Sequence, residues 1–208
     1  MPSMYNVHNP ICREVSQSSK HGLATNIAFT LSSIQERTFL LPKYMQDYAL
    51  YGWEAPHFKR INKYKGASYV RDNIDDLWKS FNDILDSGKD VKVKCVLLFS
   101  TIPMISTVKA GFITQLAVGK VGCLDSHNLT RYGIDPKRFH INDKLGLDTK
   151  TRKVRDYTQT CDSLGGSRVL WNKWCPHIAK TYPNHFNNGF EVSKLHADCF
   201  AYIHAPMH

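Results

Sequence analysis

The sequence contains no long hydrophobic run, no internal repeat, no low-complexity tract and no evident linker. A membrane-spanning helix needs about 18 or more consecutive apolar residues, and no segment approaches that length, so we expect no membrane span. Residues 1–20 are polar and lack the apolar centre of a signal peptide, which predicts a cytosolic location. No feature of the sequence specifies an oligomeric state.

Cysteines are few and scattered, which argues against a disulfide framework or a metal cluster. The spacing of Cys175, His177 and His185 matches no standard zinc pattern, and Pro176 intervenes, so we expect no metal site and no cofactor. The apolar surroundings of most cysteines favour buried free thiols. The six cysteines are Cys12, Cys95, Cys123, Cys161, Cys175 and Cys199.

The chain has 208 residues, 42% of them hydrophobic, which suits one compact domain or two closely fused lobes. Its net charge of +9 is unevenly distributed. Residues 137–180 hold ten Lys and Arg against four Asp, and "HFKRINKYK" (57–65) is a second basic cluster, whereas residues 71–86 are acidic. Such segregation favours a nucleic-acid-binding face. The alternative is the solvated surface of a protein that happens to be basic.

The hydrophobic period is helical along most of the chain, and we therefore predict an all-α fold. The segment 92–100 is apolar enough for a strand, but its helical neighbours favour a helix. N-caps are expected at Asp148 or Thr149 and at Ser167. The predicted helices cover 18–37, 44–64 with a break near Pro56, 67–88, 92–100, 107–119, a short stretch from about Ser126, 149–166, 167–182 and 190–204.

The stretch "VGKVGCLDSHNLTRYG" (118–133) places an acid, a hydroxyl and an imidazole where an apolar run ends. Asp125 stands where a helix N-cap belongs. It can serve as a simple cap, as a carboxylate held for chemistry, or as both. His127 can contact a phosphate, orient Asp125 or be purely structural, and Arg131 can pair with Asp125 or with a DNA backbone.

The order of features over about residues 90–133 resembles the helix-hairpin-helix DNA glycosylase superfamily, of the endonuclease III and adenine glycosylase type. In that family a Leu-Pro-Gly-x-Gly-x-x-x-Ala hairpin precedes a helix, a glycine and a catalytic Asp followed by His or Asn and, further on, Arg. The matching pieces are Ile102-Pro103, Ala110, Gly119 and "LDSHNLTR" (124–131). The resemblance implies a fold of two closely fused helical lobes over residues 1–208, with the hairpin and catalytic segment at about 100–133.

The resemblance also implies double-stranded DNA as ligand, a base flipped into a cleft, and Asp125 at the catalytic position with His127 beside it. Residues expected to contact DNA are Ser106, Thr107, Lys109, Arg131, Lys153 and Arg155.

Three departures from the family pattern bear on chemistry. Met104 and Ser106 replace the hairpin glycines, which the family uses for close approach to a phosphate. Thr107 or Val108 occupies the position of the Schiff-base lysine of bifunctional members, so we expect no lyase activity. The cysteines that bind an iron–sulfur cluster in endonuclease III are absent, so no such cluster is expected.

A base-flipping enzyme needs side chains that stack on the base or fill the space it leaves. Tyr51 and Trp53 are candidates, with Trp171 and Trp174 as others, and core packing is the alternative for each.

Two further segments, "KAGFITQLAVGKVGCLDSHN" and "LWNKWCPHIA", are similar to small tailed-phage members of the superfamily, near the alpha-glutamyl/putrescinyl thymine pyrophosphorylase-like proteins; a phage protein would act in the host cytoplasm. Three functions follow as hypotheses. The first is a monofunctional N-glycosylase acting on a flipped base, which can be a modified pyrimidine. The second is a transferase in thymine hypermodification of phage DNA, and the third is a DNA-binding protein without catalysis.

Overall fold

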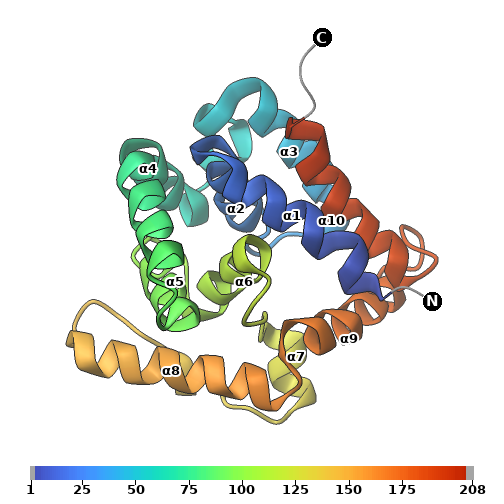
Figure 1. Ribbon diagram of the computed structural model, residues 1–208. Helices are drawn as coiled ribbons and strands as arrows, with labels where there is room; N and C mark the ends of the chain where they lie inside the picture. The colour runs from blue at the N-terminus through green and yellow to red at the C-terminus, as the bar shows by residue number, and fades with distance from the viewer. Residues whose placement is uncertain (1–2, 205–208) are drawn as a thin grey trace.

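The computed structural model describes residues 3–204, and over that range it is all-helical, with no strand (Figure 1). This confirms the predicted all-α class. The α-helices are α1 (Met4–Ser18), α2 (Lys20–Ser32), α3 (Leu41–Tyr51), α4 (Ile61–Ser87), α5 (Val91–Phe99), α6 (Thr107–Val118), α7 (Ser126–Arg131), α8 (Leu147–Ser163), α9 (Gly166–Thr181) and α10 (Gly189–His204). Short 3-10 turns cover Thr38–Leu40, Gly52–Glu54, Pro56–Lys59 and Pro136–Phe139.

The helices form two groups with α6 between them (Figure 1). The first group contains the two ends of the described chain, because α1 packs against both α2 and α10, and α10 packs against α3 and α9. The second group contains α4, α5 and α8, and α4 also packs against α2 of the first group. Helix α6 contacts α1 and α2 on one side and α5 on the other. A side chain that projects from α6 or from the segment after it therefore lies close to both groups.

Helix α6 is enclosed on all its faces. Every residue from Ala110 to Ala117 is buried, including the polar Thr114 and Gln115. At Gly111 an added Cβ would lie only 2.5 Å from the Tyr157 hydroxyl of α8. The missing side chain thus lets Tyr157 reach the chain that follows α6, where it contacts the loop before α7.

A tight connection (residues 100–106, the hairpin segment) joins α5 to α6. Met104 takes a φ of 72°, a left-handed conformation that favours glycine. The segment rests on α4 at Gly66, where an added Cβ would lie 2.6 Å from the carbonyl oxygen of Pro103. Ser106 then caps α6, its hydroxyl accepting from the Lys109 backbone N–H at 3.3 Å.

Several sequence predictions match the structure and others need correction. The helix predicted over 92–100 is confirmed as α5. The helix predicted over 44–64 is wrong in its second half, because α3 ends at Tyr51, where Gly52 adopts a φ of 54°. The predicted caps at Asp148 or Thr149 and at Ser167 are also wrong, since Gly146 and Gly165 precede α8 and α9.

Helix α1 was not anticipated from the sequence. Its buried face includes His8, Asn9 and Ser16 beside Cys12 and Val15, and Pro10 lies inside the helix. The segment is therefore polar and contains a proline, although its apolar residues follow a helical period. No helix within residues 3–204 is both long and apolar enough to cross a membrane.

Candidate functional site

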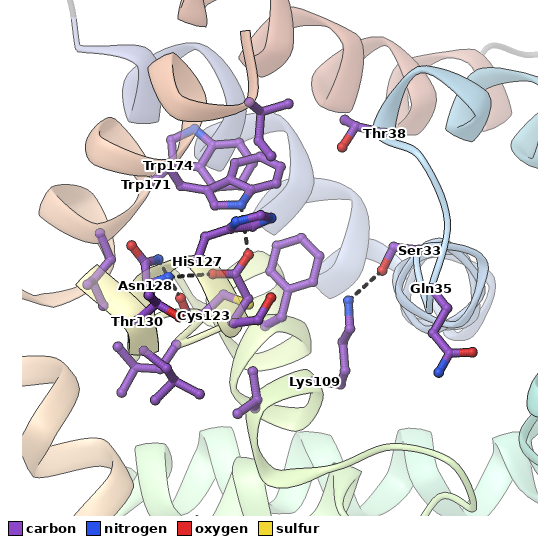
Figure 2. Close-up of a pocket in the computed structure, with 18 of the residues that line it drawn as sticks. Ser33, Gln35, Thr38, Lys109, Cys123, His127, Asn128, Thr130, Trp171 and Trp174 are labelled. Atoms are coloured by element: carbon purple, nitrogen blue, oxygen red, sulfur yellow. Dashed lines mark hydrogen bonds between the residues drawn. The ribbon is translucent and has the colours of Figure 1, made fainter. Parts of the chain in front are cut away.

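A pocket of about 1230 Å³ lies beside α6, between α9 and α10 of the first group and the segment around α7. Its walls come from the loop after α2, from α6, from α7 and the residues that flank it, and from α9 and α10. Figure 2 shows Trp171 and Trp174 on one side of the pocket and Lys109 across from them. The catalytic segment predicted from the sequence and the central helix α6 therefore open onto one space.

Asp125 lies in the wall of this pocket, half-buried, as the N-cap of α7. Its Oδ1 atom accepts from the backbone N–H of Asn128 at 3.0 Å. Its Oδ2 atom accepts from the indole N–H of Trp174 at 2.8 Å. The carboxylate is thus a helix cap and is also held in one orientation by a side chain from α9.

The loop that carries Asp125 is fixed from beneath by α8. The Tyr157 hydroxyl donates to the Gly122 carbonyl at 2.6 Å and accepts from the Leu124 backbone N–H at 3.2 Å. The Asn128 side-chain amide donates to the Cys123 carbonyl at 2.9 Å. These bonds hold both sides of the turn that leads into α7, so the position of the carboxylate is set by α7, α8 and α9 together.

Two tryptophans form an aromatic wall beside the carboxylate. The rings of Trp171 and Trp174 stack with centroids 5.0 Å apart, and both residues line the pocket. The indole N–H of Trp171 points elsewhere, donating to the Ser193 hydroxyl at 2.7 Å. Trp171 and Trp174 are three positions apart on α9, and this spacing, visible in the sequence, places both rings on one face of the helix.

Tyr51 and Trp53, the first candidates for stacking, do not reach this pocket. Trp53 packs against Tyr48 and Phe58, with ring centroids 5.1 and 5.3 Å apart. Tyr51 is exposed at the end of α3. Neither residue lines the space beside Asp125, whereas Trp171 and Trp174 do.

His127 lines the pocket but turns away from the Asp125 carboxylate. Its Nδ1 atom lies 3.1 Å from Nε2 of His177 on α9, and the two rings are 4.6 Å apart. Burial lowers the pKa of His177, and the nearby positive charges of His127 and Arg131 lower it further. Arg131 donates to Asn128 Oδ1 at 3.1 Å and to the Lys173 carbonyl at 3.3 Å. The expected pairing of either residue with Asp125 is therefore not formed.

Three of the residues expected to contact DNA lie at the start of α6, and they differ in burial and in hydrogen-bond partners. Lys109 is half-buried in the pocket wall, where its ammonium donates to the Ser33 hydroxyl at 2.9 Å (Figure 2). Thr107 is buried and its hydroxyl donates to the Phe139 carbonyl at 2.8 Å. Ser106 is exposed and already caps α6. Of the three, only Lys109 brings a charge into the pocket.

Lys153 and Arg155 lie on α8 with separate partners. The Lys153 ammonium donates to the Arg138 carbonyl at 3.0 Å. Arg155 pairs with Asp90 at 3.3 Å, beside the start of α5. Because the hairpin segment follows the other end of α5, Arg155 stands away from the residues that the resemblance assigns to DNA.

The basic cluster "HFKRINKYK" is only partly a surface feature. Lys63 is fully buried and donates to Glu36 at 2.9 Å and to the Ser32 carbonyl at 3.0 Å. Arg60 also pairs with Glu36. Two of the charges that suggested a nucleic-acid face are therefore tied to one carboxylate inside the fold.

The cysteines are all free thiols, and five of the six are buried. Cys123 is partly exposed and lines the pocket. Burial of its thiol, together with the negative charge of Asp125, raises its pKa to about 12. It is therefore a protonated, weakly nucleophilic thiol at neutral pH. Within residues 3–204 no three His, Cys, Asp or Glu side chains come together as a metal site.

The pocket thus combines an oriented carboxylate, an aromatic wall and one ammonium group, drawn from helices far apart in the sequence. Its inner wall also contains Gln115 of α6 and His196 of α10, which the sequence analysis did not select. No family model matches the chain, and neither the curated proteins nor the solved structures include one that matches it.

Proposed function

We propose that this protein acts on a base flipped out of double-stranded DNA and cleaves its N-glycosidic bond by hydrolysis. The observation that carries the proposal is the Asp125 carboxylate, held by Trp174 and by the start of α7 in the wall of a pocket. The resemblance over residues 90–133 assigns the catalytic role to the same residue. The fold is then of the helix-hairpin-helix glycosylase type, with the pocket lined by α6, α7, α9 and α10.

The carboxylate suits this reaction because positive charge develops on the sugar as the bond from C1′ to the base nitrogen breaks. The base leaves with the bonding electrons, and a preoriented negative charge stabilises the cationic sugar. Water then adds at C1′, and Asp125 is placed to take up its proton. Two hydrogen bonds hold the carboxylate in place before the reaction, so little reorganisation is needed.

The surrounding residues support recognition of a flipped nucleotide. Trp174, which is partly exposed, offers a flat surface for a base, and the buried Trp171 ring is stacked behind it. The first turn of α6 presents backbone N–H groups toward the hairpin segment, an arrangement that favours a phosphate. Lys109, in that first turn, adds a positive charge across the pocket from the tryptophans. We propose a monofunctional enzyme, because Val108 or Thr107 takes the family's Schiff-base position and the Lys109 ammonium is bonded to Ser33.

The test is release of a base from duplex DNA. The protein is incubated with genomic and phage DNA, free bases are identified by mass spectrometry, and abasic sites are detected by strand breakage in alkali. We expect base release by the natural protein and none by Asp125→Asn.

Asp135→Asn is the matched control. Asp135 lines the same pocket and also caps a short helical turn, accepting from the Lys137 backbone N–H at 2.9 Å, but it accepts from no tryptophan within residues 3–204. We expect this variant to keep its activity. If Asp125→Asn releases bases as fast as the natural protein, the assignment of Asp125 is wrong.

The size of the pocket favours a second candidate function. About 1230 Å³ exceeds the roughly 300–1,000 Å³ of ordinary small-molecule sites, so a co-substrate has room beside a flipped base. In a transferase, an amine would displace a leaving group on a modified pyrimidine while the glycosidic bond is kept, and the same carboxylate would take up the proton that the amine loses. A gain of mass on the base without strand lability would identify it. DNA binding that survives Asp125→Asn with neither product would identify a non-catalytic binding protein.

A further inference from the structure

Positive charge gathers on the segment that leaves the edge of the pocket and leads into α8. Asp135 and Pro136 line the pocket. Residues 137–153, which follow them, hold six Lys and Arg against two Asp. Helix α8 lies along one edge of the molecule (Figure 1). Three cations of this segment are fully exposed, and we call them the basic strip: Lys137, Lys144 and Arg152.

The charges of the basic strip have no partner inside the protein. Within residues 3–204 none of its three charged groups forms an ion pair or a hydrogen bond. Asp143 and Asp148 lie in the same segment, yet neither pairs with a cation of the described chain. On α10, by contrast, Lys194 pairs with Asp198 one turn away at 2.7 Å. Exposed cations that local carboxylates leave uncompensated attract an external anion.

The backbone that carries the basic strip is fixed beside the start of α6. The buried ring of Phe139 meets Tyr157 of α8 edge-on, with centroids 5.2 Å apart. The Phe139 carbonyl accepts from the Thr107 hydroxyl at 2.8 Å. Arg138 donates two hydrogen bonds to Asp156 of α8, at 2.6 and 2.8 Å. The strip therefore holds one position next to the start of α6, where a phosphate contact is proposed.

The layout of the basic strip favours an extended anion over a small one. Lys137 lies in the 3-10 turn Pro136–Phe139, Lys144 in the loop before α8, and Arg152 in the second turn of α8. The three charges are spread along the segment instead of surrounding one point. Each strand of a DNA duplex carries a phosphate about every 3.4 Å, so one duplex can contact several of these cations together.

We infer that the basic strip is a second contact surface for the DNA backbone, and that the substrate is a duplex extending past the flipped base along this strip rather than a nucleoside or a short oligonucleotide. This inference rests on the proposed function, because the pocket fixes where the flipped base lies. The sequence pointed instead to Lys153 and Arg155 in this region, but both side chains have partners within the protein.

The experiment compares two triple variants that lose the same charge. The strip variant carries Lys137→Gln, Lys144→Gln and Arg152→Gln. The control variant carries Lys43→Gln, Lys79→Gln and Lys89→Gln, at positions that are exposed, unpaired within residues 3–204 and outside both the pocket and the strip. Thermal unfolding should be unchanged in both, since no internal bond is removed.

The probe is a mixed-sequence duplex of about 30 base pairs with a tetrahydrofuran abasic analogue at its centre. Binding is measured by fluorescence anisotropy between about 50 and 200 mM salt. In the strip variant we expect the log–log slope of affinity against salt to fall by about 2–3, because each lost phosphate contact removes about 0.9. The control variant should keep the slope of the natural protein.

Shortened duplexes test the direction in which the strip leads away from the pocket. The duplex is cut to about five base pairs on the 5′ or on the 3′ side of the abasic analogue. One of the two cuts should weaken binding by the natural protein more than the other, because the strip leaves the pocket on one side. The difference between the cuts should shrink in the strip variant and persist in the control variant.

Several results would overturn the inference. These are no binding of the duplex by the natural protein, equal slopes for the strip and control variants, and a difference between the two cuts that the strip variant keeps in full. The outcome is separable from the test of base release. A strip-specific loss of binding without base release supports the DNA surface and refutes hydrolysis, whereas base release with equal binding by the two variants refutes the strip alone.

Discussion

Asp125 differs from an ordinary helix cap in that both of its carboxylate oxygens accept a hydrogen bond. Oδ1 bonds the backbone N–H of Asn128 and Oδ2 bonds the indole N–H of Trp174. Asparagine keeps one oxygen but replaces the other by an amino group. That group would face the N–H of Trp174, donor against donor. Substitution of Asp125 therefore affects stability as well as chemistry. Part of the expected loss of stability depends on Trp174.

We predict that Asp125→Asn lowers the free energy of unfolding by about 1 kcal/mol, because the cap survives but the bond to Trp174 is lost. Asp125→Ala loses both bonds and should cost about 2 kcal/mol. In the double variant Asp125→Asn with Trp174→Phe the facing donors are gone, so its cost should be smaller than the sum of the single costs. Urea unfolding of the natural protein, Asp125→Asn, Asp125→Ala, Trp174→Phe and the double variant measures these costs, and strict additivity in the double variant would contradict the proposed conflict between donors.

Trp174 and Trp171 allow the orienting role of the indole N–H to be tested against a matched neighbour. Trp174→Phe keeps an aromatic ring but removes the bond to Asp125, so kcat for base release should fall about tenfold while KM changes little. Trp171→Phe removes an N–H that bonds Ser193 instead, so its kcat should change much less. Equal effects of the two substitutions on kcat would show that the bond to the carboxylate is not what matters.

At the scale of elements, the hairpin segment shows how the connection between α5 and α6 tolerates a non-glycine residue. Met104 is left-handed at φ 72° and 46% exposed, so its side chain gains little from packing. A left-handed conformation costs an L-residue about 1–2 kcal/mol, and glycine avoids most of that cost while losing about 0.5–1 kcal/mol in chain entropy.

We therefore predict that Met104→Gly stabilises the protein by up to about 1 kcal/mol and tightens DNA binding, because the backbone can then approach a phosphate more closely. Thermal unfolding and a DNA titration measure the two effects. Met104→Ala keeps a Cβ and serves as the control, with no gain expected. A destabilised glycine variant would mean that the methionine side chain contributes more than the strain removes.

At the scale of the whole molecule, three buried histidines make stability depend on pH. Burial is the main cause of a lowered pKa at each of them. It lowers the pKa of His8 well below its usual value, that of His57 to about 4 and that of His196 to about 3. The unfolded chain protonates each ring near pH 6.5, whereas the folded chain does not until the pH is much lower. Protons are thus taken up on unfolding between pH 6.5 and about 4, and acid favours the unfolded state.

We predict that the free energy of unfolding falls below pH 6.5 by about 1 kcal/mol per pH unit for each of these histidines. Urea titrations at pH 7, 6, 5 and 4.5 measure the slope. His196→Phe removes one of the three groups, so its slope should be about one third smaller. A slope unaffected by that substitution would place the proton uptake on other groups.

Charge over the whole surface determines the expected dependence of DNA binding on salt. If the basic residues near the pocket contact phosphates, affinity falls steeply with salt, and each lost contact reduces the log–log slope by about 0.9. We expect that reduction for Lys109→Gln and Arg131→Gln. Arg155→Gln should change the slope less, because Arg155 pairs with Asp90 beside the start of α5. Affinity that does not vary with salt would contradict a nucleic-acid face.

The sequence by itself determined the helical class, most helix positions and the place of Asp125 at the start of α7. These are local properties, since period, caps and breaks depend on residues within a few turns. It did not reveal α1, whose buried face is largely polar, nor the burial of Lys63 against Glu36. Both depend on partners distant in the chain.

Only the tertiary structure decided what surrounds Asp125. Trp174 meets it across 49 positions of sequence, and Gln115 and His196 share a wall although they lie on α6 and α10. The same packing places Trp171 and Trp174 beside the carboxylate, whereas Tyr51 and Trp53 lie elsewhere. A sequence pattern identifies which face of a helix is apolar, but which helix it meets depends on how all ten helices pack within the described residues.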